Sequence, residues 1–80
     1  MERKKMRNKI FQSGYYEFEI AEQIGVVRSQ LSFILSGKTK RINHKIVTKL
    51  TDVLNCNASD ILGKRDMVRY QTDIENEIKK

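Results

Sequence analysis

Apolar residues recur at steps of three and four along most of the chain, which is the period of a helix with one buried face. This pattern predicts two helices that end at Gly14 and Gly25 and a third from about Arg28 to Ser36. A fourth helix follows the cap residue Asn43, and a short fifth is stopped by Gly63. The apolar positions that define these helices are Met6, Ile10, Phe11, Phe18, Ile20, Ala21, Ile24, Leu31, Ile34, Leu35, Ile46, Val47, Leu50, Val53, Leu54, Ala58, Ile61 and Leu62. No strand-like alternation persists, so we expect an all-α fold, a compact bundle of about five short helices.

The segment from Ile20 to Ile34 has the spacing of a helix-turn-helix. Two short helices that cross at a steep angle need a small side chain where they touch, and Ala21 supplies one. The first helix must end at a residue that tolerates a positive φ, and Gly25 meets that need. Apolar residues on both sides of this turn give each helix a face to bury. The second helix of such a pair leaves its other face free to enter the DNA major groove.

Charge is segregated along the chain. The 80 residues carry a formal net charge of +6, and no acidic residue occurs between Gln23 and Thr51. That acid-free span contains Arg28, Lys38, Lys40, Arg41, Lys45 and Lys49, and a second basic cluster covers residues 3–9. A solvated lysine-rich face would explain a basic run in many small domains. Because this span begins at the helix-turn-helix, we interpret it as a surface for a polyanion.

Composition excludes several classes of protein. No apolar run is long enough for a membrane span, and no apolar stretch follows the basic N-terminus as in a signal peptide. The single cysteine, Cys56, forms no internal disulfide, and with only one histidine, His44, it builds no zinc site. We therefore expect a cytoplasmic bacterial protein with no metal and no cofactor, in which Cys56 is a small buried hydrophobe. Because no catalytic constellation is present, we do not expect an enzyme, and we interpret Glu17, Glu19 and Glu22 as a solvated helix face.

Two separated segments carry a family resemblance that spans roughly Met6 to Gly63. IAEQIGVVRSQLSFILSGK, residues 20–38, is similar to the typical "LAEKLGVSRSTISRIERGK" of phage-repressor-like (Xre/Cro-type) helix-turn-helix domains. KLTDVLNCNASDIL, residues 49–62, resembles the closing "KLAKALGVSLDELL" of the same family. The resemblance implies a lambda-repressor-like fold, double-stranded DNA as the partner, and the third helix in the major groove.

The resemblance also implies roles for individual residues. The side chains expected at base edges are Arg28, Ser29, Gln30, Ser32 and Phe33, with Arg28 suited to guanine and Gln30 to adenine. The side chains expected at phosphates are Ser36, Lys38, Lys40, Arg41 and Lys45. For Arg28 and Gln30 the alternative is a phosphate contact or a solvated side chain. Phe33 either contacts a thymine methyl group or folds back as peripheral core.

Two positions depart from the family pattern, and the N-cap of the short fifth helix has two candidates. Glu17 stands where the family often has a glutamine that bonds a phosphate, and a carboxylate there repels DNA. Val27 is a poor N-cap, so we expect the start of the third helix to shift with Ser29 taking part. Either Asn57 or Ser59 can cap the short fifth helix.

The tail, residues 64–80, lies outside the domain that we assign to residues 1–63. Apolar residues at helical spacing predict an amphipathic helix there: Met67, Tyr70 or Gln71, Ile74 and Ile78. Its apolar stripe suits a homodimer or the groove of a protein partner. The alternative is a marginal helix that folds onto its own domain or frays.

These features together predict a sequence-specific DNA-binding protein, a transcriptional repressor of a phage or other mobile element. Two alternatives remain at this stage. One is an architectural or excision-type factor that binds DNA with weak specificity. The other is a protein-interaction module, such as an antitoxin or antirepressor, that uses the tail and Phe33.

Overall fold

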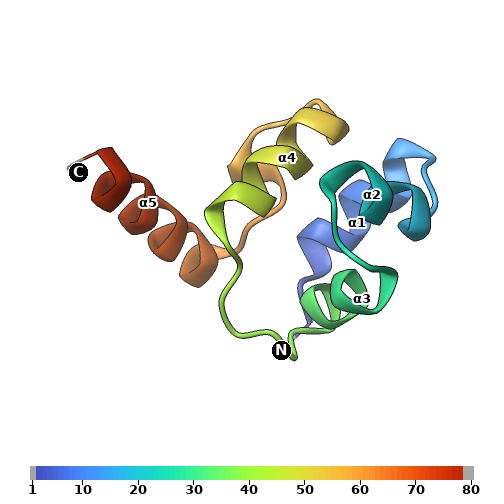
Figure 1. The fold of residues 1–80 in the computed structure, drawn as a ribbon, viewed down its shortest axis with the longest axis horizontal. Coiled ribbons are helices and arrows are strands. Elements are labelled where there is room, and N and C mark those ends of the chain that lie inside the picture. Colours follow the sequence, from blue (N-terminus) through green and yellow to red (C-terminus); the bar gives the residue numbers. More distant parts are fainter. Residues whose placement is uncertain (1, 79–80) are drawn as a thin grey trace.

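The computed structural model describes residues 2–78, and it is helical throughout, with no strand in that range (Figure 1). The elements are α1 (Lys4–Ser13), α2 (Glu17–Ile24), α3 (Arg28–Ser36), α4 (His44–Leu54), a single 3-10 turn η1 (Ala58–Asp60) and α5 (Lys64–Ile78). The all-α expectation is confirmed. The fifth short helix is only the 3-10 turn, and a longer helix, α5, follows it and lies at one end of the molecule.

The turn between α2 and α3 has the geometry that the sequence predicts. Gly25 ends α2 with φ +79°, a left-handed conformation in which a residue with a β-carbon is strained. The next residue, Val26, donates its N–H to the carbonyl of Ala21 at 3.0 Å and closes the turn. Ala21 itself is buried. This small residue and this glycine together let α3 cross α2 and present its far side to solvent.

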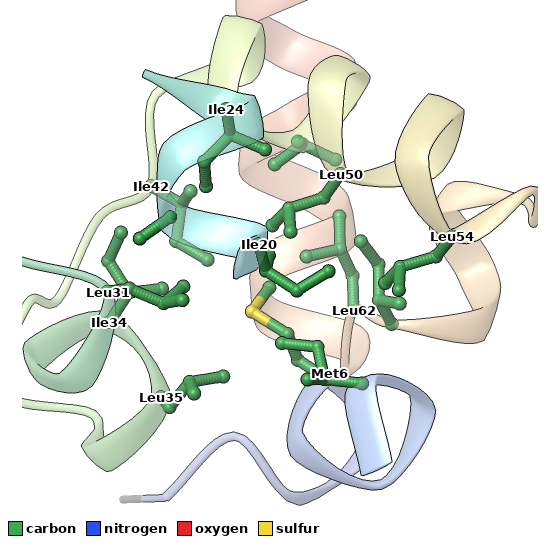
Figure 2. Close-up of a cluster of buried hydrophobic side chains, with 14 residues drawn as sticks. Met6, Ile20, Ile24, Leu31, Ile34, Leu35, Ile42, Leu50, Leu54 and Leu62 are labelled. Atoms are coloured by element: carbon green, nitrogen blue, oxygen red, sulfur yellow. The ribbon is translucent and has the colours of Figure 1, made fainter. Parts of the chain in front are cut away.

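The core is one continuous cluster of buried apolar side chains from α1, α2, α3 and α4, the loop before α4 and the two residues after η1 (Figure 2). Its members are Met6, Ile10, Ile20, Ala21, Ile24, Leu31, Ile34, Leu35, Ile42, Val47, Leu50, Leu54, Ile61 and Leu62. Two aromatic residues counted among the apolar positions do not join it: Phe11 is 85% exposed and Phe18 is 53% exposed. Phe11 follows Ile10 directly, so it points about 100° around α1 from the buried stripe.

Local caps explain where the later elements begin. The side chain of Asn43 accepts the N–H of Lys45 at 2.8 Å, which confirms it as the N-cap of α4. Asn57, rather than Ser59, precedes η1, and its N–H donates to the Asp60 carboxylate at 3.0 Å. Gly63 does not merely stop that turn. Its carbonyl accepts the N–H of Met67 at 2.9 Å and so opens α5.

The tail helix α5 is packed on its own domain. Met67 and Tyr70 are half-buried against the core, so part of the apolar stripe predicted for the tail is used within the chain. Asp66 in the first turn of α5 forms an ion pair with Arg3. Of the helices described, none is both long and apolar enough to cross a lipid bilayer.

Candidate nucleic-acid interface

The outer face of α3 is polar and open to solvent. Arg28, Ser29, Gln30 and Ser32 are all exposed, whereas Leu31, Ile34 and Leu35 are buried on the opposite side. Arg28 makes no ion pair with any residue from 2 to 78. The side chains expected at base edges therefore share one accessible surface.

The start of α3 differs from the expectation. The helix begins at Arg28 with Val27 as its N-cap, and Ser29 lies inside the first turn. Val27 is in an extended conformation and offers no side-chain acceptor, so the N–H groups of the first turn receive no cap bond from it. These N–H groups stay available to an external acceptor at the N-terminal end of α3.

Phe33 lies outside the core. Its side chain is 49% exposed, and the ammonium group of Lys38 sits 5.4 Å from the centre of its ring. This distance is within the range of a cation–π interaction. Phe33 therefore adds an apolar contact surface to α3 and holds Lys38 beside it.

The loop that connects α3 to α4, residues 37–43, and the first turn of α4 carry four basic residues, Lys38, Lys40, Arg41 and Lys45. Lys38, Lys40 and Lys45 are exposed and form no ion pair within the part of the chain that the structure covers. Ser36 is engaged differently, because its hydroxyl donates to the carbonyl of Phe33 at 3.1 Å. The three lysines are free to contact an anion, whereas the Ser36 proton is already in use.

Arg41 is also engaged. Its guanidinium donates to the carboxylate of Asp73 in α5, and one turn further along α5 Glu77 forms an ion pair with His44. These two ion pairs were not predicted from the sequence, in which residues 64–80 were assigned to a tail outside the domain. A signal was present: Asp66, Asp73 and Glu77 are spaced by seven and four residues, which places their carboxylates on one helical face.

Arg3 has a structural role that the sequence did not indicate. Its side chain is only 8% exposed, and it donates to the Asp66 carboxylate at 2.9 Å and to the Ile34 carbonyl at 2.6 Å. A further bond at 3.2 Å reaches the carbonyl of Lys40. Arg3 thus ties the N-terminus to the end of α3, the connecting loop and α5, and it does not belong to a free basic cluster.

The start of α2 carries one cap and a group of exposed aromatic side chains. The Glu19 carboxylate accepts the N–H of Tyr16 at 3.0 Å, so this residue caps α2 and is not only part of a solvated face. Tyr16 stacks on Phe18 with ring centres 5.6 Å apart, and both rings are exposed. Phe11 is exposed as well, and it lines an open pocket together with Tyr16.

Cys56 is half-buried, and burial raises the pKa of its thiol. A thiol of this kind is a weak nucleophile at neutral pH. Among residues 2–78, no group of three or more histidine, cysteine and acidic side chains is placed to hold a metal ion.

Comparison with known proteins gives a family. No curated protein and no solved structure matches the chain. A family model described as the Cro/C1-type HTH DNA-binding domain matches residues 1–65, which include the turn at Gly25, the exposed face of α3 and the basic loop. The chain therefore belongs to the Cro/C1-type helix-turn-helix DNA-binding domain family.

Proposed function

We propose that this protein is a sequence-specific transcriptional regulator that represses by occupying an operator with α3 in the major groove. The observation that carries the proposal is the exposed polar face of α3, together with cations that form no ion pair among residues 2–78. Arg28, Gln30 and two serines lie on that face, Lys38 lies against the ring of Phe33, and Lys45 is exposed in the first turn of α4. A long duplex of regular negative charge fits such an arrangement better than a folded protein surface does.

The residues divide into two groups by what they can contact. Arg28 and Gln30 can each form paired hydrogen bonds with a base edge, and each such pair discriminates by about 1–3 kcal/mol. Ser29 and Ser32 are small enough for close approach, and Phe33 can contact a thymine methyl group. Contacts to phosphates come directly from Lys38, Lys40 and Lys45, and from Ser36 and Arg41 once each gives up its present contact with Phe33 or Asp73. These contacts set position and salt dependence.

Operator recognition by this small domain calls for two copies. A pair of recognition helices about 34 Å apart reads an inverted repeat across one turn of DNA. Residues 64–80 are the segment that we propose for a homodimer, although Met67 and Tyr70 already pack within the chain. The apolar side chains that α5 leaves exposed are Val68, 62% exposed, and Ile78, 78% exposed.

Selection of binding sites from a random duplex pool tests the proposal. The wild-type chain is expected to enrich an inverted repeat, and Arg28→Ala and Gln30→Ala are expected to alter the enriched bases. Arg65→Ala and Gln12→Ala serve as matched controls, since both wild-type side chains are exposed and lie outside α3. An enriched site that neither α3 variant changes would contradict the base contacts. Salt-sensitive binding without any enrichment would instead indicate an architectural factor.

One observation favours a second candidate function. The exposed aromatic residues Phe11, Tyr16 and Phe18 give the chain an apolar surface of the kind that binds proteins, as an antitoxin or antirepressor does. If protein binding is the main function, charge reversal at Lys38, Lys40 and Arg41 will leave biological activity intact. If DNA binding is the main function, the same change will abolish it.

A further inference from the structure

The face of α5 that meets the connecting loop is acidic, although the loop belongs to the DNA-binding surface. Asp73 holds the guanidinium of Arg41, and Glu77 holds His44, the first residue of α4. Arg69 lies between Asp66 and Asp73 on the same helix. It donates to the Lys40 carbonyl at 2.7 Å and fixes α5 against the loop. In Figure 1, α5 lies beside the start of α4 and away from α1 and α2.

The carboxylate of Asp73 stands in surroundings that suit a phosphate. It lines an open cavity of about 400 Å³ together with Arg41, Ile42, Asn43 and His44. Arg41 supplies a cation and His44 a ring nitrogen, and the cavity lies beside the N-terminus of the 11-residue helix α4, where the helix dipole favours an anion. An arginine in such a place binds a carboxylate and a phosphate by the same fork of N–H donors.

We propose that α5 is an intramolecular competitor of DNA, in which Asp73 and Glu77 occupy two side chains, Arg41 and His44, that otherwise contact the phosphate backbone. This inference rests on the proposed function, which assigns Arg41 to the phosphate contacts, and it adds the neighbouring His44. Binding of DNA then requires that Arg41 exchange a carboxylate for a phosphate.

The side chains themselves are placed for such an exchange. The side chain of Arg41 is 64% exposed, so a phosphate can reach its guanidinium from solvent. The side chain of Asp73, its partner on α5, is only 16% exposed. Glu77 is 54% exposed, and its ion pair with His44 lies near the end of the helix. Ion pairs this open to water are weak enough to be exchanged. The competition therefore tunes affinity and does not abolish binding.

The test measures the affinity for a short duplex of mixed sequence at several salt concentrations. Asp73→Asn keeps the size of the side chain and removes its charge, and we expect binding about twofold to fivefold tighter at low salt, since an exposed ion pair has about that effect on an equilibrium constant. We expect the salt slope to change by less than about 0.9, the value for one phosphate contact, because Arg41 contacts a phosphate in both complexes. Glu77→Gln is a second, independent variant with the same expected direction.

The matched control is Glu75→Gln. Glu75 lies on the same helix, is exposed, and makes no ion pair with the described residues, so this change alters net charge equally without freeing a cation. An Arg41→Ala background provides the second control, because the gain from Asp73→Asn should disappear there. Thermal melting of each variant shows whether the fold is kept.

The outcomes separate this inference from the proposed function. Equal gains from Asp73→Asn and Glu75→Gln would overturn the competition and leave DNA binding intact, as would a gain that survives in the Arg41→Ala background. Failure of the wild-type chain and of every variant to bind any duplex would overturn the proposed function, and the inference with it.

Discussion

At the scale of single residues, the same side-chain chemistry has different uses according to its surroundings. Arg28 and Arg3 are both arginines of a basic chain, yet Arg28 is exposed on α3 and Arg3 is enclosed by carbonyl and carboxylate acceptors. A guanidinium withdrawn from water is stable only when its N–H groups are bonded, and those of Arg3 reach Asp66, Ile34 and Lys40. Arg3 is therefore part of the folded framework.

This difference gives a prediction for stability. Arg3→Ala leaves the Asp66 carboxylate without its partner and removes one of the donors to the carbonyls of Ile34 and Lys40, and we expect it to lower the free energy of unfolding by about 2–3 kcal/mol. The exposed Arg65, which forms no ion pair in the described chain, provides the control, and Arg65→Ala should change stability by less than about 0.5 kcal/mol. Urea denaturation of both variants measures the two values. Equal losses would show that Arg3 has no special structural role.

At the scale of the elements, the helices were predictable where a local residue marks their ends. Gly14, Gly25 and Gly37 each adopt a left-handed conformation after a helix, and Asn43 caps α4 with its own side chain. Local signals did not show how α5 would dock, because its contacts join residues far apart in the chain. The pair of Arg3 with Asp66, for example, spans 63 positions. Nor did spacing alone reveal that Phe11 and Phe18 face solvent.

At Gly25, the free-energy cost of a left-handed backbone conformation can be measured without a side-chain clash. A β-carbon added there meets only the flexible ammonium group of Lys49, at 3.9 Å, so a loss of stability reflects the positive φ and not a clash. We expect Gly25→Ala to cost about 1–2 kcal/mol. Gly63→Ala is the control, since Gly63 has no positive φ and open space around it, and it should be neutral or slightly stabilising. Chemical denaturation would contradict this account if the two variants lost stability equally.

At the scale of the whole molecule, some parts of the candidate interface can be predicted from the sequence and others cannot. The exposed face of α3 follows from helical periodicity, since Leu31, Ile34 and Leu35 must point inward and the residues between them outward. The positive charge of the loop is also predictable, because the sequence has basic residues and no acidic residue in the same span. The pairing of Arg41 with Asp73 depends on the tertiary position of α5, so periodicity within α3 and α4 contains no information about it.

The balance of free and paired cations predicts how salt acts on DNA binding. Lys45 is exposed in the first turn of α4 and has no acidic partner among residues 2–78, so we expect Lys45→Ala to reduce the salt slope by about 0.9 without changing the preferred sequence. Lys64→Ala removes the same charge from the first turn of α5 and should leave the slope unchanged. Measuring the affinity of both variants for DNA at several salt concentrations gives the two slopes and tests this difference. Both lysines lie in the first turn of a helix, so only a local phosphate contact distinguishes them. Equal salt slopes for the two variants would therefore mean that the overall charge of the domain, and not a phosphate contact at the start of α4, attracts DNA.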